Sequence, residues 1–215
     1  MTAGRTTSSA SQHWCTPPKY VHAIRRFFRG RIDLDPCANK HSIVEAEVEY
    51  RLPRQDGLRL EWNFRRIFVN PPYGADRARK TTIKHWLHRC HQAHVEHGAQ
   101  VLALVPVATN TAHWKHYVWG AASSICFLYD TRLKFLVDGK DGGKGAPMSC
   151  AMIYWGERVE EFDRVFSEFG AVLDVRSLLG REFGGQAKKS EQPALSVEGK
   201  PAVDVPLKRI AGRGR

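Results

Sequence analysis

The sequence predicts an α/β fold, in which a mostly parallel sheet forms the middle layer of a three-layer α/β/α domain. Apolar segments of strand length alternate with amphipathic helical segments in units of roughly 30 residues, the pattern of parallel α/β proteins. Residues 99–109, AQVLALVPVAT, are apolar almost throughout, as expected of a parallel strand that is buried on both faces. A chain of 215 residues, of which 42% are hydrophobic, can form one domain with a core but not two large domains.

The first half of the chain predicts one helix and two strands. Residues 16–28, TPPKYVHAIRRFF, combine Thr16 as an N-cap, a proline at the first helical position and apolar residues at helical spacing. Strands are predicted over 31–38, RIDLDPCA, and over 65–73, RRIFVNPPY, where prolines end the apolar run. The segment 39–55 between these strands is expected to be irregular, with a helical turn near its middle.

The second half of the chain continues the alternation. We expect, in order, a helix over 81–98 that ends at Gly98, a strand over 99–109, a helix over 113–119, a strand over 123–130, a glycine-rich loop over 138–147, a strand over 148–156, a helix over 157–170 and a last strand over 171–178. The domain organisation that follows is a disordered segment at 1–12, one folded domain over 13–179 and a flexible basic tail over 180–215.

The charge of the chain predicts a polyanionic partner. The formal net charge is +11 and the isoelectric point is near 9.7, which favours nucleic acid as the partner. The excess is uneven, because the first 31 residues hold six Lys or Arg and no acid, and residues 181–215 hold eight basic residues against four acids. Solubility alone could also explain this charge, and a basic balance names a class of partner without naming an activity.

Several classes of protein are disfavoured by composition. No segment approaches the roughly 18 apolar residues of a membrane span, and the N-terminus has no apolar region of a secretory signal. Five scattered cysteines without a CxxC pair indicate neither a zinc site nor a disulfide framework. Histidines at every third position from 85 to 97 spiral around a helix, so no metal is expected there. We therefore expect a soluble cytoplasmic protein.

Two polar motifs follow predicted strands. Asp35-Pro36 ends the first strand, and Asn70-Pro71-Pro72-Tyr73 ends the second. In open α/β sheets, ligands bind outside the carboxyl ends of the strands, so both motifs are candidates for a functional site. Two consecutive prolines make a rigid turn that can hold an amide, a carbonyl and an aromatic ring in a fixed relation.

The Asn-Pro-Pro-Tyr turn suits chemistry on the exocyclic amino group of a nucleobase. The lone pair of this nitrogen is delocalised into the ring, and two acceptors aimed at its hydrogens would localise it. The side-chain oxygen of Asn70 and the carbonyl of Pro71 would be these acceptors, and Tyr73 would stack on a base extruded from the duplex. Direct attack on a methyl sulfonium carbon would then depend mainly on positioning and electrostatics.

The motifs resemble those of the phage-type DNA N6-adenine methyltransferase (Dam) family. Matching segments run in order from Trp14 to about Gly156, and they are WCTPPKYVHAI, IDLDPCA, QDGLRLEW, IFVNPPYG, VLALVPVATNTAHW, TRLKF and GAPMSCAMIYWG. The resemblance implies a Rossmann-like fold that uses S-adenosylmethionine and methylates N6 of adenine in DNA. It also implies a phage or prophage origin, in the cytoplasm of a bacterial host, and a role like that of restriction-modification enzymes.

The resemblance implies roles for individual residues. Thr16 and Pro17 match the segment that lies against the methionine part of S-adenosylmethionine. Asp35 matches the acid near its amino group, and Asp56 an acid near its adenine. The target amine would be held by Asn70, Pro71, Pro72 and Tyr73, and Arg132, Lys140 and Lys144 are candidates for contacts with DNA.

The sequence leaves alternatives open. No glycine follows the first strand in DPCANKH, although many methyltransferases have a glycine-rich loop there. The acid for the ribose hydroxyls could be Glu45, Glu47 or Glu49. Asp56 could be only the acid of an Asp-Gly turn. The turn would also serve cytosine N4 or an RNA amino group, and the chain could instead be a non-catalytic, basic nucleic-acid-binding protein.

Overall fold

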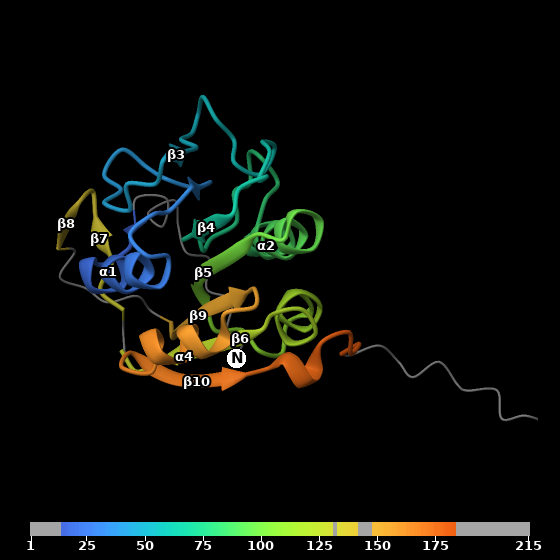
Figure 1. The fold of residues 1–215 in the computed structure, drawn as a ribbon. Helices are drawn as coiled ribbons and strands as arrows, with labels where there is room; N and C mark the ends of the chain where they lie inside the picture. Colours follow the sequence, from blue (N-terminus) through green and yellow to red (C-terminus); the bar gives the residue numbers. More distant parts are fainter. Residues whose placement is uncertain (1–13, 131–132, 142–147, 184–215) are drawn as a thin grey trace, which may run out of the picture. The chain divides into compact units, whose positions relative to one another are not determined.

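The structure is a computed structural model that describes residues 14–130, 133–141 and 148–183 (Figure 1). The predicted disordered segment 1–12 and most of the predicted tail, from residue 184, lie outside the described residues. Within the described part, no helix has the length and apolar character needed to span a membrane.

The centre of the fold is a mixed sheet. Among the described residues it has seven strands in the order β10-β6-β9-β5-β4-β2-β3. Their bounds are β2 (Leu34–Asp35), β3 (Val48–Glu49), β4 (Arg66–Val69), β5 (Gln100–Pro106), β6 (Ser124–Leu128), β9 (Cys150–Trp155) and β10 (Gly170–Asp174). The α/β class is confirmed.

The prediction of a mostly parallel sheet is wrong for half of the strand pairs. Strands β3, β2, β4 and β5 pair in parallel, whereas β9 is antiparallel to both β5 and β6, and β10 is antiparallel to β6. Parallel neighbours need a crossover connection, usually a helix, but the chain passes from β6 to β9 through a β-hairpin. The apolar runs predicted burial on both faces and said nothing about strand direction.

Helices cover both faces of the sheet (Figure 1). On one face, α1 and α4 pack against Phe68, Leu102 and Met152, and on the other, α2 and η2 pack against Ile67, Val101 and Ile153. These strand residues alternate in sequence, so neighbouring side chains enter opposite cores. The helix bounds are α1 (Pro18–Phe27), α2 (Ile83–His97), α3 (Ala112–Trp114), η2 (Lys115–Trp119), α4 (Val159–Phe166) and η3 (Arg176–Leu178).

The helix ends confirm one prediction and correct another. Gly98 ends α2 in the left-handed conformation with φ of 63°, as predicted. Thr16 is not the N-cap of α1, because Pro17 occupies that position and the Thr16 side chain makes no capping bond. Residues 39–55 contain β3 in place of the expected helical turn, because parallel pairing with β2 draws this segment into the sheet.

A second, three-stranded sheet forms from distant parts of the chain. Strand β1 (Trp14–Cys15) pairs with β7 (Leu136–Val137), which pairs with β8 (Lys140–Asp141). The first residues of the predicted glycine-rich loop are therefore a hairpin. Its two-residue turn, Asp138-Gly139, has positive φ at both positions, as a tight hairpin turn requires. Residues 142–147 of that loop lie outside the described residues.

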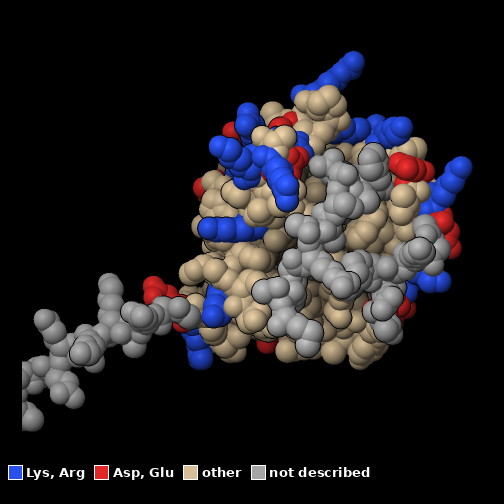
Figure 2. Space-filling view, turned by 180° about the vertical axis from the view of Figure 1, so that it is seen from behind, with Lys and Arg blue, Asp and Glu red and all other residues tan. Residues whose placement is uncertain are grey.

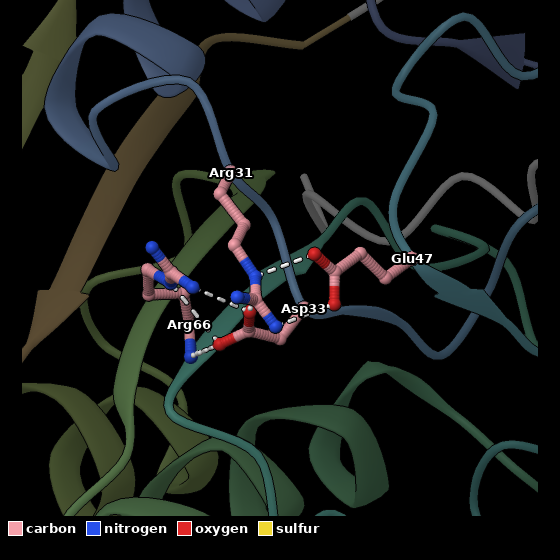
Figure 3. A network of polar contacts seen from close by, with 4 residues as sticks. All are labelled: Arg31, Asp33, Glu47 and Arg66. Atoms are coloured by element: carbon pink, nitrogen blue, oxygen red, sulfur yellow. Dashed lines mark hydrogen bonds and ion pairs between the residues drawn. The ribbon is translucent and has the colours of Figure 1, made fainter.

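A cluster of ion pairs connects the amino ends of β2 and β4 (Figure 3). The buried carboxylate of Asp33 accepts hydrogen bonds from the backbone nitrogen of Arg66 at 2.9 Å and from its guanidinium at 2.7 and 3.1 Å. Arg31 bridges Asp33 to Glu47, which precedes β3. Burial alone would raise the pKa of Asp33, but the bonds from Arg66 hold it below its ordinary value.

Candidate active site

The two motifs at predicted strand ends come together at the carboxyl edge of the parallel half of the sheet. Asp35 ends β2, and Asn70 follows β4, which pairs with β2 in parallel. Both side chains line one small pocket together with Thr16 and with the loop residues Cys37 and Asn39. Parallel strands bring their carboxyl ends to the same edge, which is why residues 35 positions apart meet.

The side chain of Asn70 is oriented by Thr16. Asn70 Nδ2 donates a hydrogen bond to Thr16 Oγ1 at 3.1 Å, and Thr16 is buried. Thr16 lies between β1 and the N-cap of α1, so two elements hold it in place. Because its nitrogen is engaged, the amide of Asn70 keeps Oδ1 as its available acceptor. Pro17 is buried at the helix start and does not line the pocket.

Tyr73 is anchored inward by its hydroxyl and remains partly exposed. The hydroxyl donates to the Leu104 carbonyl at 3.1 Å, and burial raises the pKa of the phenol well above its ordinary value. The ring is nearly perpendicular to Trp14 and to Phe135, at centroid distances of 5.9 and 5.5 Å. Trp14 and Phe135 stack on each other at 5.0 Å. Sequence reasoning did not predict this trio, although Asp138-Gly139 signals the hairpin that delivers Phe135.

Asp35 is a buried acid without a cationic partner in direct contact among the described residues. It is 4% exposed, and its Oδ1 accepts a hydrogen bond from the backbone nitrogen of Cys37 at 3.0 Å. Burial, reinforced by the charge of Glu49, raises the pKa of Asp35 to about 7, against the lowering effect of the Cys37 bond. A cationic ligand that enters the pocket would stabilise the ionised form of this carboxyl.

Asp56 lines a second and larger cavity of about 290 Å³ that begins at the same loop. Residues 37–39 line both cavities, so the two are neighbours. Asp56 accepts a hydrogen bond from the backbone nitrogen of Leu58 at 3.1 Å, which is the turn role that the sequence also allowed. Pro72 lines this cavity too, whereas Pro71 is buried.

Gly57 allows the 56–58 loop to approach the end of β2. A Cβ at position 57 would lie 1.8 Å from the Pro36 carbonyl oxygen, closer than any real contact. The Gly57 carbonyl also accepts a hydrogen bond from Trp62 Nε1 at 2.7 Å. A glycine distant in sequence therefore lets the 56–58 loop pack directly against the loop that follows β2.

The structure separates the three candidate glutamates. Glu45 pairs with Arg25 and Glu47 with Arg31, both away from the pocket. Glu49 ends β3 directly beside Asp35, to which it is matched in the strand register. Its side chain is mostly buried and pairs with Arg51, which lines the larger cavity. Glu49 is thus the one of the three at the carboxyl edge.

The predicted DNA contacts are only partly described. Lys140 is exposed in β8, and Arg132 and Lys144 lie outside the described residues. Figure 2 shows Lys and Arg side chains gathered along the upper part and the sides of one face, with some Asp and Glu among them. No group of three or more metal-binding side chains lies within the part of the chain that the structure describes.

The structure thus places Asn-Pro-Pro-Tyr directly after a central strand of an α/β sheet, the setting in which the sequence predicted a methyltransferase that acts on an exocyclic amino group. Comparison with known proteins identifies the family. The family model described as DNA N-6-adenine-methyltransferase (Dam) matches residues 3–174. The DNA N-6-adenine-methyltransferase of Haemophilus phage HP1 (strain HP1c1) is 27% identical over 136 residues, which cover 63% of this chain and 73% of the phage protein. No solved structure matches.

The chain therefore belongs to the DNA N-6-adenine-methyltransferase (Dam) family. It is an adenine-specific DNA methyltransferase, which transfers a methyl group to N6 of adenine in DNA. The family confirms the predicted resemblance and decides between adenine N6 and the alternatives of cytosine N4, RNA and a non-catalytic protein. It also implies a methyl donor.

Proposed function

We propose that the methyl donor is S-adenosylmethionine and that the two neighbouring cavities at the carboxyl edge bind it. The single observation that carries this proposal is the convergence of Thr16, Asp35 and Asn70 on one pocket that adjoins the cavity beside Asp56. The larger cavity, about 290 Å³, is near the lower end of the ~300–1,000 Å³ typical of small-molecule sites. The donor supplies an electrophilic methyl carbon on a sulfonium.

The residues that line the cavities fit the parts of this donor. Asp35, buried and without a cation, suits its ammonium group, since a positive charge would stabilise the ionised carboxylate. Glu49 lines neither cavity and its carboxylate pairs with Arg51, but it ends the strand beside Asp35, which makes it the candidate of the three glutamates for the ribose hydroxyls. Asp56 suits the adenine amino group, although its Oδ1 accepts a hydrogen bond from Leu58 and its Oδ2 forms an ion pair with Arg59 at 3.6 Å.

We assign the target amine to Asn70 and Pro71. With Nδ2 held by Thr16, the amide of Asn70 presents Oδ1 as an acceptor. The ring of Pro72 restricts the backbone of the residue before it, which keeps the Pro71 carbonyl from swinging away. These two oxygens would accept the two hydrogens of the amine and localise its lone pair. The lone pair would then form the new bond to the methyl carbon as the bond from that carbon to sulfur breaks, with the sulfonium leaving as a neutral thioether, and the methylated amine would lose a proton to water.

Tyr73 would stack on the extruded adenine. Its hydroxyl is bound to the Leu104 carbonyl and its ring packs against Trp14 and Phe135, so the exposed part of the ring is held in one orientation. Tyr73 itself lines neither of the two cavities. Stacking of a base on an aromatic side chain is worth about 1–3 kcal/mol. We assign Lys140, Arg132 and Lys144 to the DNA backbone, on the basis of their charge.

We also propose a Rossmann-like methyltransferase fold and a cytoplasmic place of action. The parallel half of the sheet, β3-β2-β4-β5, is covered by helices on both faces, which supports the fold assignment. A relative from a phage supports action on DNA inside a bacterial host, where methylation would protect phage DNA as in restriction-modification systems.

The test is the substitution Asn70→Ala. Loss of an acceptor that acts on the reacting amine should lower the single-turnover rate of methyl transfer by ~10²–10³-fold, while the affinity for S-adenosylmethionine changes little. The matched control is Asn63→Ala, at an exposed position outside the pocket, which should leave the rate unchanged. Transfer at the wild-type rate by Asn70→Ala would refute the assignment.

A further inference from the structure

The amino edge of the sheet holds another cavity, far from the Asn-Pro-Pro-Tyr turn. Its volume is about 360 Å³, and it is lined by Phe28, Arg29, Arg65, Arg66, Gln100 and Arg158. The lining has four guanidinium groups and no carboxylate. Arg66 begins β4 and Asn70 follows its end, so the strand separates the two sites by about 13 Å at ~3.3 Å per residue.

Two of the four guanidinium groups are held in place by the fold. Arg66 is fixed by its bonds to Asp33 (Figure 3). Arg158 lies over the ring of Phe27 at 4.8 Å, and its backbone nitrogen donates to the Tyr154 hydroxyl at 3.0 Å. Groups fixed in this way lose little conformational entropy when a ligand binds.

Several N–H groups of these arginines have no hydrogen-bond acceptor among the described residues. Arg158 Nη2 is buried and has no hydrogen-bond partner, and the nearest acid, Glu161, is 3.9 Å away. The side chains of Arg29 and Arg65 make no hydrogen bond or ion pair with the described residues. A buried charged donor without an acceptor is costly, and it is therefore rare unless a ligand or water completes it.

The nearby acids do not neutralise the cavity. Asp33 is shared by Arg66 and Arg31, Glu47 is engaged by Arg31, and Glu161 is shared by Arg158 and Arg164. The guanidinium groups around the cavity therefore carry more positive charge than the nearby acids can balance.

We propose that this cavity binds a phosphoryl group. Planar guanidinium groups bind oxyanions through paired hydrogen bonds, which favours an oxyanion over chloride. With four guanidinium groups around the cavity, a phosphoryl group can use three or more oxygens at once, whereas a carboxylate has only two. The strand that separates the cavity from Asn70 makes this phosphate different from that of the extruded nucleotide. It belongs either to the backbone of a further DNA segment or to a phosphorylated small molecule.

The first test is a titration of the full chain with inorganic phosphate in which binding is detected by ³¹P NMR. The wild type should bind phosphate, and Arg158→Gln should weaken binding at least tenfold. Arg176→Gln, which removes the same charge outside the cavity, should not. Because Arg158 packs on Phe27 and its loss could unfold the chain, Arg29→Gln serves as the second variant, with folding checked by circular dichroism. Absence of phosphate binding, or binding unchanged in both cavity variants, overturns the proposal.

The second test identifies the source of the phosphate. If DNA supplies the phosphate, Arg158→Gln should lower the slope of log Kd against log salt for a short duplex by about the increment that one phosphate contact contributes. Arg176→Gln should leave this slope unchanged. If inorganic phosphate binding is lost in Arg158→Gln and the slope for the duplex is unchanged, the ligand is a phosphorylated small molecule. Neither outcome depends on methyl transfer.

Discussion

The hydrogen bond between Thr16 and Asn70 suggests a positioning role for a residue that the sequence offered as a helix cap and, through the family resemblance, as a contact of the donor. Thr16 is buried, and its hydroxyl accepts from Asn70 Nδ2 at 3.1 Å. Thr16→Val keeps the shape of the side chain and removes the acceptor, so the amide of Asn70 is free to rotate. We expect the rate of methyl transfer to fall by about one to two orders of magnitude, since removal of a hydrogen bond in a buried site costs ~1–3 kcal/mol.

Thr16→Ser is the control for this prediction, because it restores the hydroxyl. Its transfer rate should return to within a few-fold of the wild type, measured in single-turnover assays at saturating donor. A Thr16→Val enzyme with an unchanged rate and a raised KM for the donor would show that Thr16 contacts the donor without orienting Asn70.

Asp35 should make donor binding depend on pH. Its pKa is raised to about 7 by burial, so the carboxyl is neutral below that pH and ionised above it. A cationic donor prefers the ionised form, so affinity should fall as the pH decreases from 8 to 6, by up to about tenfold per unit below the pKa. Calorimetry at pH 7 in buffers of different ionisation enthalpy should detect proton release on binding. Asp35→Asn should bind the donor with an affinity that changes less between pH 8 and pH 6, and it should release fewer protons on binding than the wild type.

The same substitution should stabilise the protein without donor. A folded-state pKa above the unfolded value of 3.8 means that ionisation costs stability as the pH rises from about 4 to 7. The melting temperature of Asp35→Asn should therefore exceed that of the wild type at pH 8 and approach it at pH 4. A difference that does not change with pH would contradict the raised pKa.

At the scale of elements, we expect the proposed donor site to depend on how closely the 56–58 loop approaches the end of β2. Gly57→Ala would place a Cβ against the Pro36 carbonyl, and both partners are backbone, so one segment must move. We expect a loss of about 1–3 kcal/mol in the free energy of unfolding and at least tenfold weaker binding of S-adenosylmethionine.

Gly98→Ala separates these two effects. Gly98 ends α2 with φ of 63° and has open space around it, so alanine there strains the backbone by about 1–2 kcal/mol without reaching the cavities. Denaturant unfolding should reveal destabilisation in both variants, and only Gly57→Ala should lose donor affinity. Equal affinity in the two variants would show that the approach of the 56–58 loop does not shape the site.

Most elements could be predicted from the sequence, because their signals are local. The helix α2 has periodic apolar residues and a terminal glycine, and β4 and β5 are apolar runs bounded by proline or charge. Strands of two residues, such as β3 and β7, have no periodic signal and form only because a neighbouring strand pairs with them. The Asp138-Gly139 turn was the one local sign of the second sheet.

For the whole molecule, the basic balance should appear as a salt dependence of DNA binding. Residues 184–215 hold seven Lys or Arg against three acids. Removal of this segment should weaken binding to a duplex and reduce the slope of log Kd against log salt, since fewer counterions are released. The control is a chain of full length in which four of these basic residues are replaced by Gln. An unchanged slope in both proteins would exclude the tail from the DNA contact.

The sequence by itself determined the α/β class, the principal helices and strands, and the motifs that resemble the Dam family, because each depends on residues that are close together in the chain. Only the tertiary structure decided the mixed direction of the sheet, the bond from Thr16 to Asn70, the position of Glu49 beside Asp35 at the carboxyl edge, and the approach of Gly57 to Pro36. Each of these depends on which distant segments become neighbours. Which distant segments become neighbours is determined when the sheet forms and both of its faces are buried, and local sequence patterns do not predict this.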